Sequence, residues 1–221
     1  FKQYYANFHK KIFHTLYHSS MTNEANPIKD QSFRIDKESY LLKNAEYFNS
    51  PNQDDRRDGQ DPEIIVIHGI SLPPGEYGGS YVSDLFLNSL DISVCEYFKE
   101  ISTLKVSSHL FIDRLGRVTQ FVPFNSRAWH AGESAYRGRE MCNHFSIGIE
   151  LEGQDNDEYS DIQYVCLAKT INALFEFYPR MSARDIVGHS DIAPKRKTDP
   201  GPAFNWKRLY TEIRSQSKNH D

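Results

Sequence analysis

The alternation of hydrophobic and polar residues predicts two long buried strands. Residues 64–67 (Ile-Ile-Val-Ile) form an uninterrupted β-branched run, which is typical of a strand buried on both faces. Residues 146–152 instead alternate with the period of a strand. Their aliphatic face consists of Ile147, Ile149 and Leu151, and their other face consists of Gly148, Glu150 and Glu152. Glu150 therefore does not belong to the core that the aliphatic side chains form.

A hairpin and three helices are predicted around these strands. Residues 109–113 and 117–124 are strand-like, with a turn between them. Residues 81–90 read as a helix. Ser160 and Gln163 form the capping box of a second helix, which ends before Pro179 and has its apolar stripe at Tyr164, Leu167, Ala168, Ile171, Leu174, Phe175 and Tyr178. Asn205 is the expected N-cap of the last helix, which buries Trp206, Leu209, Tyr210 and Ile213.

Strands interspersed with helices indicate a single α/β domain in which helices flank a mixed central β-sheet. We place this domain at residues 62–214 and a polar tail at residues 215–221. Residues 21–61 form an N-terminal approach segment, whose polar, charge-mixed end predicts an exposed loop. Residues 1–20 are an N-terminal extension.

This extension does not fit a signal peptide. A signal peptide requires an uninterrupted apolar segment, but Lys10, Lys11 and His14 interrupt the aromatic residues of this stretch. Two interpretations stay open. One is an amphipathic basic helix, and the other, which we favour, is a stretch left from processing or upstream of a natural start at Met21.

Composition narrows the class of protein. The 221-residue chain is 38% hydrophobic, which is enough for a substantial core. Its net charge of −4 is not the positive charge that a nucleic-acid-binding protein typically carries. No apolar run approaches the roughly 18–20 residues of a membrane span. Three cysteines without a Cys-x-x-Cys pair exclude a disulfide framework and suit a reducing compartment. We therefore expect no nucleic-acid or membrane partner.

Nine histidines are the first indication of chemistry. His68 follows the apolar run 64–67, and His189 follows a second, shorter apolar run. Asp199 precedes Pro200 on a stiff loop. Two histidines and a carboxylate match the protein ligands of a hydrolytic zinc site that leaves its fourth position to water. The alternative is structural, with His68 completing a strand and Asp199 capping a turn.

Glu150 and Lys197 would complete a hydrolytic site. A carboxylate beside a metal-activated water can accept its proton. Lys197 lies two residues before Asp199 and could supply positive charge to the oxyanion of a tetrahedral intermediate. As one residue of the basic run 195–197, it could equally be a solvated surface lysine.

Five blocks of sequence carry a resemblance to a known family. They read HGISLPPGEYGG (68–79), VSSHLFIDRLGRVTQFVPF (106–124), RAWHAGES (127–134), CNHFSIGIELEG (142–153) and GHSDIAPKRKTDPGPAFNW (188–206). Together they resemble the AmpD group of zinc N-acetylmuramoyl-L-alanine amidases, from about Phe33 to Ile213. That group is related to the peptidoglycan recognition proteins.

The resemblance implies a zinc site at one end of a mixed sheet. The implied reaction is hydrolysis of the lactyl amide between N-acetylmuramic acid, typically in its 1,6-anhydro form, and L-alanine of the stem peptide. His68, His189 and Asp199 would ligate zinc, Glu150 would be the general base and Lys197 would stabilise the intermediate. The implied setting is the cytoplasm of a bacterium, where a monomer would act on soluble anhydromuramyl peptides during cell-wall recycling and so affect β-lactamase induction.

The resemblance also implies substrate contacts. Trp129 would pack against a sugar or lactyl group, unless it is a core tryptophan. Tyr97 and Lys105 stand where the family has pocket residues, although Lys105 replaces an arginine and loses its bidentate fork. His130 would line the pocket rather than bind metal. An arginine expected two residues after Arg139 is absent, and Arg139 could compensate.

Two departures from the family pattern concern the preferred stem peptide and not the reaction. The residue after the first histidine ligand is Gly69, where the family has asparagine, so a side-chain amide beside the metal is lost. The missing arginine is Met141. His109 is expected to line the site or lie in the core without being a fourth ligand.

Two other functions stay open. A peptidoglycan-recognition-like module would hold muropeptides without cutting them, and loss of a zinc ligand would indicate it. All three expected ligands are present. An amidase that acts on polymeric peptidoglycan would use the same chemistry but would require export.

Overall fold

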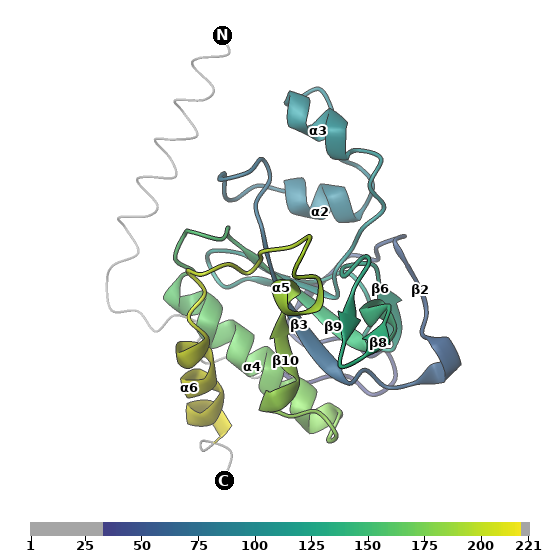
Figure 1. The fold of residues 1–221 in the computed structure, drawn as a ribbon, viewed down its shortest axis with the longest axis vertical. Coiled ribbons are helices and arrows are strands. Elements are labelled where there is room, and N and C mark those ends of the chain that lie inside the picture. The colour runs from purple at the N-terminus through teal and green to yellow at the C-terminus, as the bar shows by residue number, and fades with distance from the viewer. Residues whose placement is uncertain (1–32, 218–221) are drawn as a thin grey trace. The chain divides into compact units, whose positions relative to one another are not determined.

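The computed structural model describes residues 33–217, in which helices surround a six-stranded sheet (Figure 1). The strand order is β1-β5-β4-β9-β3-β10; β4 and β5 pair antiparallel and all other neighbours pair parallel. The strands are β1 Glu46–Tyr47, β3 Ile64–Ile70, β4 Leu110–Ile112, β5 Val118–Gln120, β9 Ser146–Glu152 and β10 Ile186–Gly188. The predicted mixed α/β sheet and hairpin are confirmed. The expectations for residues 1–20 and for the end of the tail lie outside the described residues.

The two predicted long strands, β3 and β9, are neighbours at the centre of the sheet. They pair over seven residues, from Ile64 opposite Ser146 to Ile70 opposite Glu152. Residues 64–67 are buried, as their β-branched run predicts, and every residue of β9 is buried on both faces. The polar face of β9 is thus covered as well, which the alternating pattern does not show.

Short elements complete the loops at the ends of the sheet. The small antiparallel pairs join β2 (Gln53–Asp55) to β6 (Ser126–Ala128), and β7 (Ala135–Tyr136) to β8 (Arg139–Glu140). The 3-10 turns are Arg57–Gly59, Cys142–His144 and Ala183–Asp185, and α5 is the short helix His189–Ile192.

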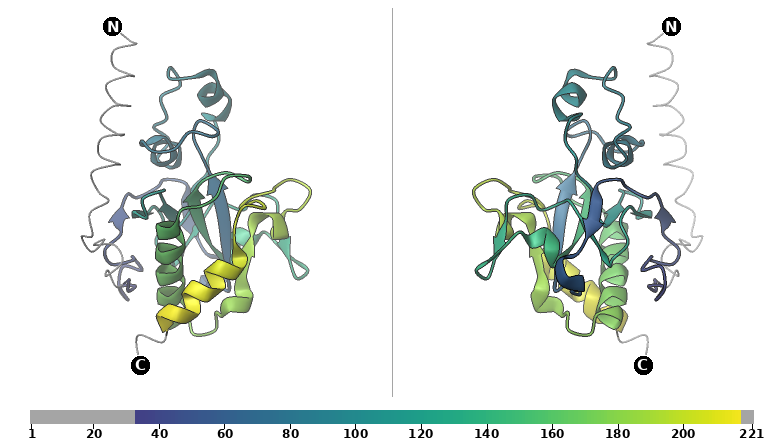
Figure 2. Two further views of the ribbon diagram at one scale, coloured as in Figure 1. Left: turned by 90° about the vertical axis from the view of Figure 1, so that its left-hand side faces the viewer. Right: turned by 90° about the vertical axis from the view of Figure 1, so that its right-hand side faces the viewer.

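Helices α4 (Asp161–Phe177) and α6 (Trp206–Ser217) lie side by side against the sheet (Figure 2). The capping box of α4 is confirmed, since the Ser160 side chain accepts from the Gln163 N–H and Gln163 accepts from the Ser160 N–H. Asn205 caps α6 by accepting the N–H of Arg208 at 2.9 Å. Leu209 and Ile213 are buried as predicted, whereas Trp206 and Tyr210, which stack on each other, are only partly buried. Among residues 33–217, no helix has the length and apolarity needed to cross a bilayer.

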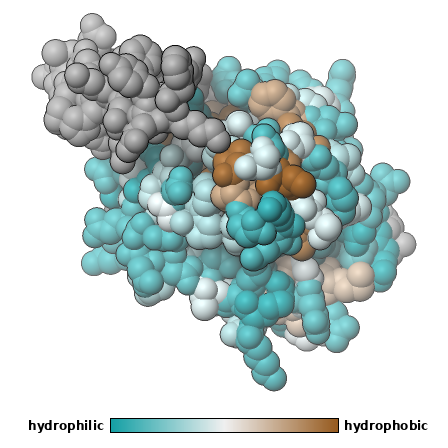
Figure 3. Space-filling model, turned by 90° about the horizontal axis from the view of Figure 1, so that it is seen from above, coloured by the Kyte–Doolittle hydropathy of each residue, from teal (hydrophilic) through white to brown (hydrophobic). Residues whose placement is uncertain are grey.

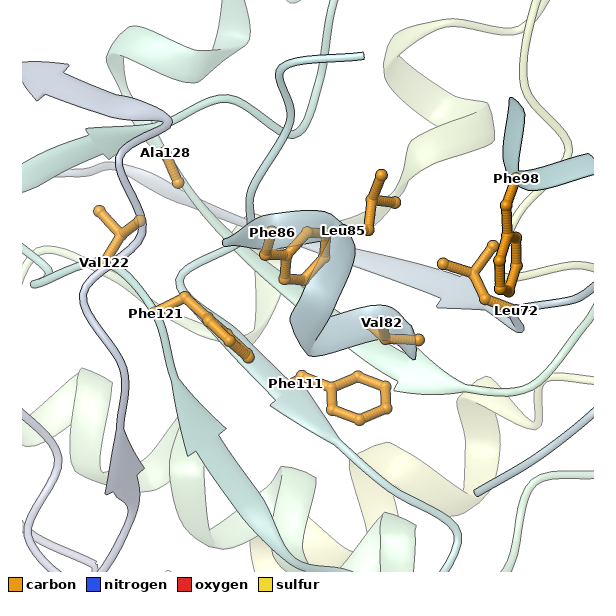
Figure 4. Close-up of a cluster of buried hydrophobic side chains, with 9 residues drawn as sticks. All are labelled: Leu72, Val82, Leu85, Phe86, Phe98, Phe111, Phe121, Val122 and Ala128. Atoms are coloured by element: carbon orange, nitrogen blue, oxygen red, sulfur yellow. The ribbon is translucent and has the colours of Figure 1, made fainter. Parts of the chain in front are cut away.

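Helices α2 (Tyr81–Phe86) and α3 (Glu96–Ile101) lie beyond the end of the sheet at which β3 finishes (Figure 1). The first is shorter than predicted because Asn88 adopts a left-handed φ of 58°, which an α-helix cannot continue. A cluster of apolar side chains, drawn in Figure 4, fixes both helices. It consists of Leu72, Val82, Leu85, Phe86, Phe98, Phe111, Phe121, Val122 and Ala128.

The predicted exposed loop before residue 62 is exposed at most of its positions, but it also contains a short strand and buried polar residues. Residues 53–55 form β2, and residues 46–47, just before the loop, supply the edge strand of the main sheet. Three polar residues of this segment, Ser50, Asn52 and Arg56, are buried because their side chains form hydrogen bonds with backbone groups of other segments. The Asn52 amide, for example, donates to the Val106 carbonyl at 2.7 Å. Polar composition alone does not reveal such long-range partners.

Arg56 is the main polar link between this segment and the sheet. It is 5% exposed, and it donates to the carbonyls of Phe124 (3.2 Å), His144 (3.1 Å) and Ser146 (2.9 Å). Burial lowers the pKa of Arg56 to about 10. The guanidinium is therefore a multiple donor that joins three chain segments.

We expect Arg56→Ala to lower the free energy of unfolding by at least about 3 kcal/mol, because several buried carbonyls lose their donor together. Arg57→Ala, at the exposed neighbouring position, is the matched control and should unfold like the parent protein. Urea unfolding followed by far-UV circular dichroism measures both. Equal midpoints for the two variants would contradict the structural role of Arg56.

Candidate metal centre and active-site cleft

The sheet brings the two candidate histidine ligands together. Strand β10 is the parallel neighbour of β3, with Gly188 opposite Ile67. His189 and His68 come next on their respective segments, so their rings meet although 121 residues separate them. The Nδ1 atoms lie 2.9 Å apart, and Asp199 Oδ2 lies 3.2 Å from Nδ1 of His68 and 3.1 Å from Nδ1 of His189. These three side chains form a group that could hold a metal ion.

The protonation of the two rings suits metal binding. His189 Nε2 lies 3.1 Å from the Ala131 carbonyl, which can only accept, so Nε2 carries the proton and Nδ1 faces the centre with its lone pair. Burial lowers the pKa of His68 to about 4, which leaves the ring neutral at pH 7. Burial alone would raise the pKa of Asp199, but the adjacent His189 and His68 side chains outweigh burial and hold that pKa far below its ordinary value. Neutral imidazoles and an ionised carboxylate are the forms that ligate metals.

Glu150 faces the same centre from the neighbouring strand. The register of β3 and β9 places it opposite His68, and its Oε1 lies 3.9 Å from His68 Nδ1. Its Oε2 is buried and has no hydrogen-bond partner among the described residues. Burial, followed by the negative charge of Asp199, raises the pKa of Glu150 well above its ordinary value, and the positive charge of Lys197 opposes this. A buried carboxylate oxygen with no protein partner suggests a site for a ligand or a water molecule.

A cleft of about 700 Å³ opens over this centre and contains all five residues of the predicted hydrolytic set. One wall is apolar and formed largely by α2, α3 and the segment after α3, with Leu85, Phe86, Tyr97, Ile101, Leu104 and Val106. Other parts of the lining are polar, with Gln154, Asp155, Asn156, Arg196 and Thr198. Beyond the apolar wall, Ile92 and Val94 are about half exposed, and the face seen from above carries a gathering of hydrophobic residues on a largely hydrophilic surface (Figure 3).

The structure separates the five candidate substrate contacts into two groups. Tyr97 and His130 line the cleft. Lys105 is exposed between two lining residues but is not itself a lining residue. Trp129 also lies outside the lining, close enough to Asp54 to contribute to the lowered pKa of that carboxyl, whose main cause is Arg127. Arg139 lies elsewhere, 2.6 Å from Glu63 and over the Phe145 ring.

His109 was predicted either to line the site or to lie in the core, and the structure places it in the core. It is fully buried and accepts the N–H of Gly148 at Nδ1 (3.0 Å). Its Nε2 lies 3.1 Å from the Ser126 carbonyl and 3.0 Å from a guanidinium nitrogen of Arg56. Both ring nitrogens thus have partners in the core, and His109 does not line the cleft.

Tyr159 is a site residue that the sequence did not indicate. It is 4% exposed, and its hydroxyl donates to the Pro200 carbonyl at 3.0 Å, directly after Asp199. A Cβ atom at Gly69 or at Gly153 would overlap its side chain. The space beside Gly69, where the family has an asparagine side chain, is therefore partly filled by this tyrosine. Two glycines facing one aromatic ring from different segments are a signal that only a known fold can expose.

Comparison with known proteins agrees with the site. A family model described as N-acetylmuramoyl-L-alanine amidase matches residues 58–202. The 1,6-anhydro-N-acetylmuramyl-L-alanine amidase AmpD of Haemophilus influenzae is 48% identical over 179 residues, covering 81% of this chain and 97% of that protein. The crystal structure of a selenomethionine derivative of AmpD is similar with a TM-score of 0.78 and 49% identity, covering 81% of this chain and 98% of that one.

A more distant structure contains a ligand. It is that of AmpDh3 from Pseudomonas aeruginosa in complex with an anhydromuramic pentapeptide, at 28% identity and a TM-score of 0.51. The match covers 80% of this chain and 65% of that one.

The buried histidines predict how the metal-free protein responds to acid. Burial lowers the pKa values of His68, His109 and His130 below the ordinary value of 6.5. Between pH 7 and pH 5 the unfolded chain takes up protons that these native rings do not, so stability falls as the pH falls. Glu150, whose native pKa is raised, acts in the opposite direction but is a single group.

We expect a net loss of at least about 2 kcal/mol of unfolding free energy from pH 7 to pH 5, the amount that His68 alone would contribute. Urea midpoints of the protein in a chelating buffer at pH 7, 6 and 5 measure this loss. A midpoint that stays constant or rises toward pH 5 would show that the rings are not buried in their neutral forms.

Proposed function

The chain belongs to the N-acetylmuramoyl-L-alanine amidase family, and from this membership we propose that it is a zinc enzyme of muropeptide hydrolysis. The proposed bond is the amide between N-acetylmuramic acid, in its 1,6-anhydro form, and the L-alanine of a stem peptide. The names of the relatives with about half of their residues identical support this substrate. The observation that carries the proposal is the convergence of His68, His189 and Asp199 below a cleft that Glu150 also faces.

We propose zinc as the metal because the donor set is two imidazoles and one carboxylate, which is typical of catalytic zinc sites with an open position. Bound zinc would supply Lewis acidity, which polarises the amide carbonyl and makes water a better acid. Both histidine rings are held on the side that faces away from the centre, His189 by donating from Nε2 to the Ala131 carbonyl and His68 by the 2.8 Å contact of its Nε2 with His130. The centre is therefore built to bind without large rearrangement.

Glu150 is the proposed general base. Its Oε2 has no hydrogen-bond partner among residues 33–217, so it is free to accept a proton from the attacking water. Burial raises the pKa of this carboxyl, which makes it a stronger base than an exposed glutamate. In the second half of the reaction the same group can return the proton to the leaving amine.

Lys197 is the proposed stabiliser of the tetrahedral intermediate. It lines the cleft on the loop that also carries Asp199, and it is half-buried. Its charge is close enough to lower the pKa of Glu150 against the effect of burial. A cation at this position would favour the negative oxygen that develops at the amide carbon.

The apolar and polar parts of the cleft lining suit the two parts of the substrate. We propose that the muramyl ring lies against the apolar residues near Tyr97 and that the peptide lies along the polar residues. Lys105, on the rim, is a proposed contact for a peptide carboxylate. The predicted contacts of Trp129 and Arg139 remain predictions.

We also propose that the protein acts in the cytoplasm. The three cysteines are free thiols, and two of them are buried. A reducing compartment keeps cysteines in the free thiol form. The expected monomeric state remains a prediction.

Incubation of the zinc-loaded protein with a 1,6-anhydro-N-acetylmuramyl tripeptide tests the proposal. Mass spectrometry should show anhydro-N-acetylmuramic acid and a peptide with a free L-alanine amino group. Chelation of the metal or Asp199→Ala should abolish both turnover and zinc occupancy, since one of three ligands is lost. Binding without cleavage would favour a recognition module, and faster cleavage of intact sacculi than of the soluble peptide would favour an amidase of polymeric peptidoglycan.

Glu150→Gln should keep the zinc and lower kcat by about 10² or more, the scale of a lost general base. Steady-state kinetics with elemental analysis of the same samples measures both quantities. Glu152→Gln is the matched control, because Glu152 is buried two residues further along the same strand and accepts the Arg114 N–H instead of facing the cleft. Near-parental turnover in Glu150→Gln would remove Glu150 from the mechanism.

A further inference from the structure

A second layer of polar groups lies directly behind the metal centre. His68 Nε2, the nitrogen that faces away from the centre, lies 2.8 Å from Nδ1 of His130. The two rings are nearly perpendicular, at 88°, with their centroids 5.0 Å apart. We propose that His130 is a positioning residue that fixes the tautomer and the orientation of the ligand His68. This inference rests on the proposed metal site.

The proton positions follow from the direction of the bonds. If His68 ligates through Nδ1, its Nε2 must carry the proton, and His130 Nδ1 must accept it. The proton of neutral His130 is then on Nε2, which lies 3.0 Å from the hydroxyl oxygen of Ser146. His68, His130 and Ser146 thus form one directed chain of donors leading away from the metal. Such outer-shell partners orient metal-ligating histidines and increase their basicity.

Strand β9 is shaped to accommodate His130. A Cβ atom at Gly148 would lie 2.5–2.7 Å from three atoms of the His130 ring, which is closer than real contacts allow. On the polar face of β9, Ser146 accepts from His130, Gly148 leaves room for its ring, and Glu150 faces the cleft. Three alternate residues on one face of this strand, Ser146, Gly148 and Glu150, therefore each have a different role.

The backbone around His130 holds the second ligand as well. Asn143 Oδ1 accepts the N–H groups of His130 (3.2 Å) and Ala131 (2.8 Å), which fixes this short segment. The carbonyl of Ala131 accepts from His189 Nε2 at 3.1 Å. One segment thus supports both histidine ligands, with the side chain of His130 for one and the carbonyl of Ala131 for the other.

Two other roles for His130 fit the geometry less well. Both of its ring nitrogens already have partners within 3.0 Å, so neither is available to a metal or a substrate. Its side chain is also nearly buried, at 9% exposure. It lines the cleft by its edge while its polar atoms point to His68 and Ser146.

Zinc affinity measured by chelator competition tests this role without any substrate. His130→Leu removes the acceptor for His68 and should weaken zinc binding by about 10- to 100-fold. His130→Asn places an amide oxygen near the position of Nδ1 and should restore most of the affinity. Ser146→Ala, which leaves His130 in place, should give a smaller loss in the same direction.

His109→Asn is the control for loss of a buried histidine. The His109 ring lies beside His130, with centroids 5.8 Å apart, but its nitrogens contact Arg56 and the backbone and not His68, so this variant should lose stability and keep zinc affinity. Long-range ¹H–¹⁵N spectra of the zinc-bound protein should also show His130 protonated at Nε2 and not at Nδ1.

Parental zinc affinity in folded His130→Leu, or a proton on His130 Nδ1, would overturn the inference. If His130→Leu does not fold, the inference is overturned when Ser146→Ala binds zinc with the same affinity as the parent protein. Zinc binding that weakens as expected in a protein that cleaves no muropeptide would uphold the positioning role and refute the proposed reaction. A parent protein that binds no zinc would refute both.

Discussion

The parallel pairing of β3 with β9 is the constraint on which the site depends. Because side chains alternate between the faces of a strand, a shift of one residue would move Glu150 and Gly148 to the opposite face of the sheet. The aliphatic side chains of both strands prevent such a shift, since they are buried and would have to leave the core. Hydrophobic packing therefore sets the positions of the chemical groups. The pairing of β10 on the other edge of β3 extends the same control to His189.

A centre of this kind concentrates polar groups in the interior, where each needs a partner. The fold supplies most of those partners from the backbone: the Ala131 carbonyl for His189, the Gly148 N–H for His109 and three carbonyls for Arg56. Glu150 Oε2 is one of several buried polar atoms in residues 33–217 that have no protein partner, and its position at the metal centre fits a catalytic role. Stability and chemistry are thus separated by layer, with satisfied groups behind the centre and an unsatisfied one facing the cleft.

Local patterns predicted the elements that local physics determines. The β-branched run of β3, the capping box at Ser160 and the cap at Asn205 each depend on residues close in sequence, and all were confirmed. The buried anchors in the approach segment were missed because Arg56 and Asn52 find their partners far along the chain. A buried arginine bonded to carbonyls has the same local sequence as an exposed one. Only the fold shows which of the substrate contacts inferred by resemblance line the cleft: Tyr97 does and Arg139 does not.

The sequence by itself determined the sheet class and the residues able to ligate a metal, because burial pattern and donor chemistry are properties of single residues and their neighbours. The identity of the supporting residues was decided by the tertiary structure. In the sequence, His130 is a pocket candidate by resemblance alone and Tyr159 carries no signal. Their supporting roles appear only in the fold, where β9 leaves space at Gly148 for one ring and two glycines leave space for the other. Partners of this kind depend on the relative positions of backbones that lie far apart in the chain. No local pattern encodes those positions, because they are set by the packing of the whole domain.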